Sequence, residues 1–203
     1  MRAPDRLRGR PAALLLAAAA VPAFNYFHRP DNNAYIWPTH WTTMYMSNAT
    51  LPPTDPFGIA ARQGTAAWSS TPGSDFRFFN NNGFHDPNLG DLDGANDVYF
   101  STYLGYYTLG VTYVYYTSDN MSLWDCDVAF NGYMYNWYPG YYDFRSVATH
   151  EFGHVLGLGH TFDATAVMYP TIGAGQTTHT LAADDAAGEV FLYPAPGGGG
   201  GGG

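Results

Sequence analysis

Three histidines in the stretch HEFGHVLGLGH constrain this sequence more than any other feature. His150 and His154 are four residues apart, so a helix would place both imidazoles on one face, about one turn from each other. His160 would rotate away from that face if the helix continued, so the chain has to turn before it. Gly157 can adopt the positive φ that such a turn needs, and Gly159 adds freedom just before the third histidine. The spacing predicts a helix, a turn and three imidazoles that meet at one point.

Three imidazoles around an open fourth position form the ligand set of a catalytic zinc site. Glu151 lies beside the first ligand, where its carboxylate can take a proton from zinc-bound water and deliver it to a leaving amine. A bare HExxH occurs by chance in unrelated helices, whereas the extended spacing is far more specific. The remaining histidines lack ligand spacing and are interpreted as surface or hydrogen-bonded residues: His28, His40, His85 and His179.

The chain of 203 residues has room for one domain with short appendages. Four arginines precede an apolar run over residues 11–23, which ends in small residues, so residues 1–23 are predicted to be a cleaved signal peptide. The run is shorter than the ~20 apolar residues that span a bilayer, and we expect no membrane span. Residues 24–193 are predicted to form the domain, and residues 194–203 a flexible Pro/Gly-rich tail. The protein is therefore expected to be secreted.

The formal net charge of −9 and the absence of lysine argue against binding to nucleic acid. Cys126 is the only cysteine, which excludes an intramolecular disulfide. It stands between Asp125 and Asp127, which would raise the pKa of its thiol, so we interpret it as a structural residue and not as a nucleophile.

Hydrophobic patterns predict a sheet that lies mostly before residue 140. Asp55 can cap a helix whose first residue is Pro56, and an apolar stripe from Ile59 to Trp68 continues it until about residue 72. Alternating or β-branched runs predict strands at residues 35–37, 44–46, 76–79, 98–103, 109–116 and 123–131.

Two features leave alternatives open. An oxygen-rich loop could collect calcium or be an ordinary acidic turn, and its residues are Asp91, Asp93, Asn96 and Asp97. The many tyrosines of residues 99–142 suit half-buried strands, and the alternative is a sugar-binding or adhesive surface.

The long zinc motif, followed by Met168 in Ala-Val-Met-Tyr-Pro, resembles the metzincins, in which this methionine forms a tight turn beneath the metal. Within that clan the chain looks like the matrixins, the matrix-metalloproteinase-like group, and especially their compact bacterial members. Serralysin-like and astacin-like relatives usually have a metal-binding tyrosine two residues after the methionine, where this chain has Pro170.

The resemblance implies an α+β fold: a five-stranded mixed sheet with three helices, and a zinc cleft between two lobes. It implies that the strand at residues 109–116 is an antiparallel edge strand, and that a final helix occupies the stretch at residues 181–193. Pro170 and Ile172 would form a wall of the specificity pocket, and Asp184 would anchor the final helix or the mature N-terminus. One catalytic zinc is expected, because the residues of a second, structural zinc site are missing.

These features together predict a secreted zinc-dependent endopeptidase, a monomer that cleaves extended protein or peptide substrates such as extracellular-matrix proteins. One alternative is a non-catalytic secreted binding or adhesion protein that keeps the zinc. Another is a different metzincin group such as the pappalysin-like peptidases, although the spacing to Met168 favours the matrixins.

Overall fold

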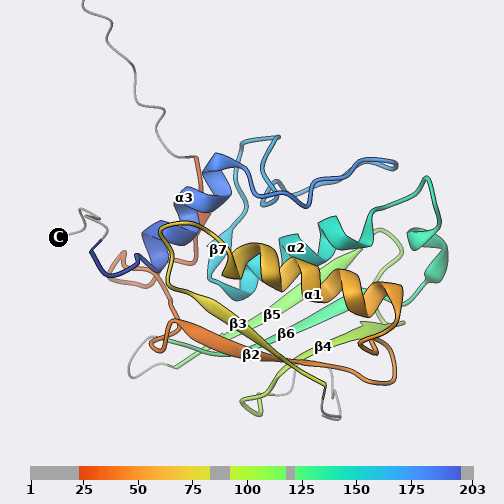
Figure 1. Cartoon of the computed structure of the whole chain (residues 1–203), viewed down its shortest axis with the longest axis horizontal. Coiled ribbons are helices and arrows are strands. Elements are labelled where there is room, and N and C mark those ends of the chain that lie inside the picture. The colour runs from red at the N-terminus through yellow and green to blue at the C-terminus, as the bar shows by residue number, and fades with distance from the viewer. Residues whose placement is uncertain (1–22, 83–91, 118–121, 198–203) are drawn as a thin grey trace, which may run out of the picture.

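The computed structural model describes residues 23–82, 92–117 and 122–197, and its centre is a five-stranded sheet (Figure 1). The strand order is β3-β2-β4-β6-β5. The three pairs β2–β3, β2–β4 and β4–β6 are parallel, and β5 pairs with β6 in the antiparallel direction. The strands are β2 (Trp41–Met46), β3 (Arg77–Asn81), β4 (Asn96–Ser101), β5 (Gly110–Tyr116) and β6 (Leu123–Asn131). The predicted mixed sheet and its antiparallel edge strand are confirmed.

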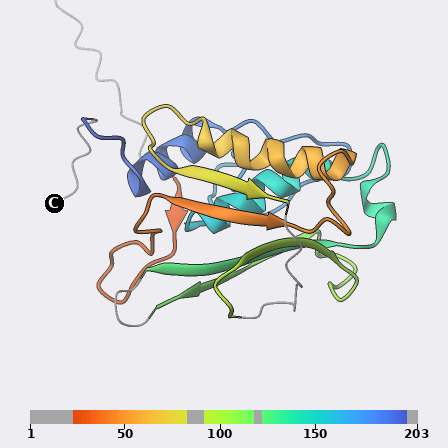
Figure 2. The ribbon, with the colours of Figure 1, turned by 60° about the horizontal axis from the view of Figure 1, so that its bottom comes forward.

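Helices α1 (Pro56–Ser69) and α2 (Phe144–Val155) lie side by side on one face of this sheet, as Figure 2 shows. Helix α3 (Ala183–Leu192) follows near the C-terminus, so the three expected helices are present. Smaller elements are the 3-10 helix η1 (Met134–Trp137) and the two-stranded pair of β1 (Asn25–Tyr26) with β7 (Leu158–Gly159). No helix in the described ranges is both long and apolar enough to cross a membrane.

Helix α1 begins as predicted, but it buries a different face. The Asp55 carboxylate accepts a hydrogen bond from the Phe57 N–H, and Pro56 occupies the first turn. The predicted stripe is wrong at Ile59, which is 44% exposed. The buried face consists of Gly58, Ala61, Gly64, Thr65 and Trp68. Small residues prevail there because α2 comes so close: a Cβ on Gly64 would lie 3.1 Å from the Phe152 ring.

The segment at residues 35–37 is buried without being a strand, so that strand prediction is wrong. Trp37 donates its indole N–H to the Val155 carbonyl at 2.8 Å, and its backbone N–H bonds the Tyr193 hydroxyl. Partners from α2 and the end of α3 thus replace a neighbouring strand. The other predicted strands appear within a few residues of their expected positions.

Ala23, the last residue of the predicted signal peptide, and Ala195, in the predicted tail, both contact the domain. The Ala23 N–H donates to the Asp184 carboxylate at 2.7 Å, and the Ala195 N–H donates to the Gly73 carbonyl at 2.8 Å. The first residues of the predicted tail therefore pack against the domain. Residues 1–22 and 198–203, which hold most of the predicted signal peptide and the polyglycine, lie outside the described residues.

Candidate metal centre and cleft

Helix α2 carries the first two histidines, and a glycine turn returns the third. Asp143 caps the helix by accepting a hydrogen bond from the Ser146 N–H. The helix ends at Val155, and Gly157 has a φ of 101°, the left-handed conformation predicted for it. Strand β7 then leads to His160, with Gly159 in an extended conformation and not at a positive φ.

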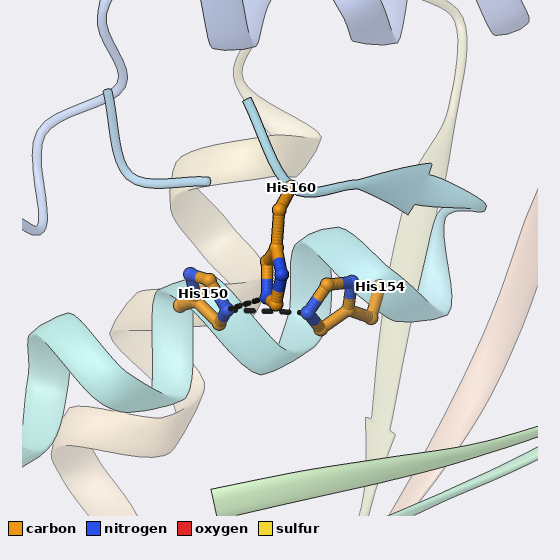
Figure 3. Close-up of side chains that lie close together, drawn as sticks. All are labelled: His150, His154 and His160. Atoms are coloured by element: carbon orange, nitrogen blue, oxygen red, sulfur yellow. Dashed lines mark hydrogen bonds between the residues drawn. The ribbon is translucent and has the colours of Figure 1, made fainter. Parts of the chain in front are cut away.

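The three imidazoles meet at one point, as Figure 3 shows. Their candidate ligand atoms all lie within 4.8 Å of one another. The Nε2 atom of His150 is 3.1 Å from that of His154 and 3.2 Å from that of His160. Nitrogens on a tetrahedral zinc, with bonds of about 2.0–2.1 Å, would be separated by roughly 3.3 Å. The observed spacing therefore fits a zinc ion.

Hydrogen bonds fix which nitrogens are free for a metal. The Nδ1–H of His150 donates to the Val167 carbonyl at 2.7 Å, and the Nδ1–H of His154 donates to the Leu158 carbonyl at 2.8 Å. The Nε2 atoms of these two neutral rings thus face each other as lone pairs, an arrangement that a cation would stabilise. His150, His154 and His160 are positioned to hold a metal ion.

Burial favours the neutral imidazoles that bind metals. It lowers the pKa of His150 to about 4 and that of His154 to about 3, where the neighbouring His150 ring adds a smaller effect. Burial also lowers the pKa of the more exposed His160. The ligands thus stay neutral at neutral pH without a metal to displace their protons.

Glu151 is buried between α2 and the edge strand β5. The Thr112 hydroxyl on β5 donates to its Oε2 atom at 2.7 Å, and a Cβ on Gly110 would come within 2.7 Å of Oε1. Burial raises the pKa of Glu151 to about 7, against the lowering effect of the Thr112 hydrogen bond. Thr112 is a site residue that the sequence motif did not reveal, because it lies on a different element from the histidines.

Met168 forms a buried support beneath the metal centre. Its side chain packs on α2 where Gly153 leaves space, since a Cβ there would lie 2.2 Å from the methionine sulfur. The Asp185 carboxylate accepts hydrogen bonds from the N–H groups of Val167 and Met168, at 2.8 and 3.0 Å. The Val167 carbonyl in turn holds His150. Asp185 is therefore connected to the first ligand through the methionine turn.

The histidines and Glu151 open into a cleft of about 880 Å³. Residues 108–112 form one side of it, and the stretch after the methionine turn, with Pro170 and Ile172, forms the other. Ser146 and Thr178 also line it. The structure thus places both predicted specificity residues on the cleft wall.

The proposed calcium ligands are only partly brought together. The Asn96 side chain is buried, with its oxygen accepting from the Cys126 N–H and its nitrogen donating to Thr42. Asp93 accepts from the Ala95 N–H two residues along the chain, as in an ordinary Asx turn. Asp97 is buried at the start of β4, and Asp91 lies outside the described residues. The calcium site stays a prediction that Asn96 does not support.

Cys126 is fully buried on β6, as expected for a structural residue. Burial is the largest cause that raises the pKa of its thiol well above the usual value, and the flanking Asp125 and Asp127 add to it. A reactive thiolate is thus disfavoured.

Two histidines on α2 and a third after the glycine turn lie with a neighbouring glutamate and a buried methionine turn beside a mixed sheet. This arrangement defines a metzincin-type metallopeptidase domain. The matrixin family model matches residues 40–194, and the chain belongs to the matrixin family.

Curated relatives match a shorter stretch. Metalloendoproteinase 1-MMP of Arabidopsis thaliana is 51% identical over 51 residues, 25% of this chain and 14% of that protein. Metalloendoproteinase 1 of Glycine max is 50% identical over 52 residues, 26% of this chain and 17% of that protein. Human matrilysin is 50% identical over 52 residues, 25% of this chain and 20% of that protein. The chain thus aligns with a fifth or less of each relative's length.

Proposed function

We propose that this protein is a secreted zinc-dependent endopeptidase that hydrolyses peptide bonds in extended protein substrates. The observation that carries the proposal is the convergence of three neutral imidazoles beside a buried carboxylate in an open cleft. Membership of the matrixin family supports it, as do the relatives named metalloendoproteinases. The placement in the compact bacterial branch stays a prediction.

The edge strand β5 suits a substrate that binds in an extended conformation. One side of β5 pairs with β6, and its first residues, Gly110 to Thr112, line the cleft. The backbone groups on its other side are in position to pair with a substrate strand. Because Glu151 contacts β5 at Gly110 and Thr112, such a strand would pass directly by the catalytic carboxylate.

Glu151 is the general base in this proposal. When held by His150, His154 and His160, zinc supplies a Lewis acid for the attacking water and the peptide carbonyl. Glu151 takes a proton from that water and then delivers it to the leaving amine. The Thr112 hydroxyl keeps the carboxylate oriented toward the cleft.

Secretion rests on the predicted signal peptide at residues 1–23, and we expect a monomer. The acidic charge favours a protein partner over nucleic acid. An alternative is a secreted binding protein that keeps the zinc and does not cleave.

A casein or gelatin cleavage assay, with and without a chelator, tests the proposal. The Glu151→Gln variant should keep one zinc per chain but lose at least ~10²-fold in turnover, the usual effect of removing a general base. Zinc content by elemental analysis is the matched measurement. Wild-type protein that binds zinc and cleaves neither substrate would favour the binding protein, and full activity in Glu151→Gln would remove the assigned base.

A further inference from the structure

An exposed group of tyrosines borders the cleft at one end of the sheet. The connection from β4 to β5 carries three of them, and the connection from β6 to α2 carries three more. We call them the tyrosine rim: Tyr103, Tyr106, Tyr107, Tyr133, Tyr138 and Tyr141, all exposed. Figure 1 shows the β6–α2 connection, with η1, at the right-hand end of the molecule. Tyr103 and Tyr107 are 86% and 92% exposed, so half-burial in strands does not account for these rings.

Asn131, fully buried at the end of β6, ties the two connections together. Its side-chain nitrogen donates to the carbonyls of Gly105 and Thr108, at 3.1 and 2.7 Å. Its side-chain oxygen accepts from the Tyr133 N–H, and its carbonyl accepts from the Trp137 indole. Loops fixed in this way lose less conformational entropy when they bind a partner.

The tyrosine rim is continuous with the cleft. Tyr107 and Thr108 themselves line it, next to the first residues of β5. On the other side, the Gly175 N–H donates to the Tyr141 carbonyl at 2.6 Å, which joins the β6–α2 connection to the loop beyond Ile172. A chain that leaves the cleft past Gly110 would therefore pass over these tyrosines.

The rim also differs in charge from the rest of the molecule. Residues 101–109 and 132–142 contain no Asp, Glu, Lys, Arg or His, although the sequence has a net charge of −9. Exposed tyrosines offer an apolar ring and a hydroxyl group, a combination that suits peptide groups and apolar side chains. The surface thus fits an uncharged segment that contains apolar or aromatic residues.

We propose that the tyrosine rim is an accessory substrate-binding surface that holds an uncharged stretch of the polypeptide just outside the cleft. This inference rests on the proposed function. The rim would contact substrate residues remote from the scissile bond. Those residues would therefore distinguish good substrates from poor ones. Continuity with the cleft favours a polypeptide over a polysaccharide as the occupant.

The test compares one short peptide with two longer ones. The short peptide has roughly eight residues around a cleavage site mapped in casein, about 26 Å when extended. Each longer peptide adds an uncharged stretch of similar length, one on the amino side and the other on the carboxyl side. The variant is Tyr103→Ser with Tyr106→Ser and Tyr138→Ser, which leaves Tyr107 in the cleft. The control is Phe79→Ser, an exposed aromatic residue on β3 at the opposite edge of the sheet.

We expect the triple variant to raise KM about 10-fold for one of the longer peptides only, and to leave the short peptide and kcat unchanged. Phe79→Ser should change none of these values. Equal effects on all three peptides, or no effect on any, would overturn the proposal. A second assay measures binding to dextran, a neutral polysaccharide. If the wild-type protein binds dextran, and the triple variant loses this binding but keeps the same KM for every peptide, the surface binds glycans and the proposal is wrong. Wild-type cleavage of the short peptide tests the peptidase function separately.

Discussion

The carboxylate of Asp185 accepts hydrogen bonds from three backbone N–H groups, those of Val167, Met168 and Ala182. It therefore holds the methionine turn and the start of α3 at once. The Val167 carbonyl accepts from Nδ1–H of His150, so the position of the first ligand depends on a residue that touches no ligand.

Replacing Asp185 with Asn should weaken zinc binding by about 10- to 100-fold, the range found for partners that orient metal ligands. A neutral amide accepts more weakly than a carboxylate, and its nitrogen cannot accept from either turn N–H. Competition with a chromophoric chelator measures the affinity. The control is Asp184→Asn, because Asp184 bonds Ala23 and not the turn. Equal zinc affinity in Asp185→Asn and wild type would show that the turn does not position His150.

The convergence of the three histidines could be predicted from the sequence because their spacing is local. His150 and His154 share a helix face, and the turn at Gly157 follows from the need to bring His160 back. Asp185 and Thr112 were missed because their partners lie 17 to 39 residues away in sequence, and neither has a signature of its own. The sequence indicated the neighbouring Asp184 for an anchoring role, but it could not show which carboxylate faces the turn.

At the scale of elements, the turn after α2 combines two constraints on one residue. Gly157 has a positive φ, and a Cβ on it would lie 2.7 Å from the Tyr35 carbonyl oxygen. Its own carbonyl accepts from the Phe27 N–H, which ties the turn to the N-terminal segment. The turn thus fixes both the end of α2 and the direction of the chain toward His160.

Gly157→Ala should destabilise the protein and displace the third ligand. The left-handed backbone alone costs about 1–2 kcal/mol for alanine, and the clash with Tyr35 adds to this. Gly140→Ala is the matched control, because Gly140 has a φ of 89° and a Cβ there would meet no neighbouring atom within 4 Å. Urea unfolding should therefore show a larger loss of unfolding free energy for Gly157→Ala than for Gly140→Ala. Chelator competition should show zinc binding about 10-fold weaker in Gly157→Ala and unchanged in Gly140→Ala. Equal behaviour of the two variants would mean that the contact with Tyr35 is unimportant.

Helices and strands were predicted well where the local sequence of one segment determines the structure. They were predicted poorly where packing between distant segments determines it. The cap at Asp55 and the strand at residues 123–131 depend on local pattern, and both are confirmed. The prediction of the buried face of α1 was wrong because α2 packs so closely that glycine and alanine fit there and the larger Ile59 does not. Residues 35–37 look like a strand, but in the described part of the chain their contact with β6 is a single backbone hydrogen bond, from the Leu123 N–H to the Ile36 carbonyl, and no strand ladder forms.

At the scale of the whole molecule, buried carboxyl groups lie in separate parts of this acidic protein. Burial raises the pKa of Asp127 on β6 to about 7, and it does the same for Glu189 on α3. Burial of Glu189 outweighs its hydrogen bonds with the Thr71 and Ser74 side chains and the positive charge of Arg77, all of which lower the pKa. The folded protein therefore favours the protonated form of Glu189 over the carboxylate.

Glu189 should make the protein less stable as the pH rises. The pKa of glutamate is about 4.5 in the unfolded chain and about 7 in the folded protein. Between these values Glu189 holds a proton in the folded state that it has lost in the unfolded state. Its contribution to stability therefore falls from about pH 4.5 to pH 7 and is constant at higher pH. The Glu189→Gln variant cannot lose that proton. Its stability should match that of the wild type near pH 4.5 and exceed it by roughly 3 kcal/mol at pH 8, since each pKa unit corresponds to about 1.4 kcal/mol.

The metal-free histidines shift stability in the opposite direction, because burial lowers the pKa of His150 and His154. Their contribution cancels in the difference between the two proteins, which urea unfolding at both pH values measures. A difference that does not change with pH would show that Glu189 remains ionised in the folded protein.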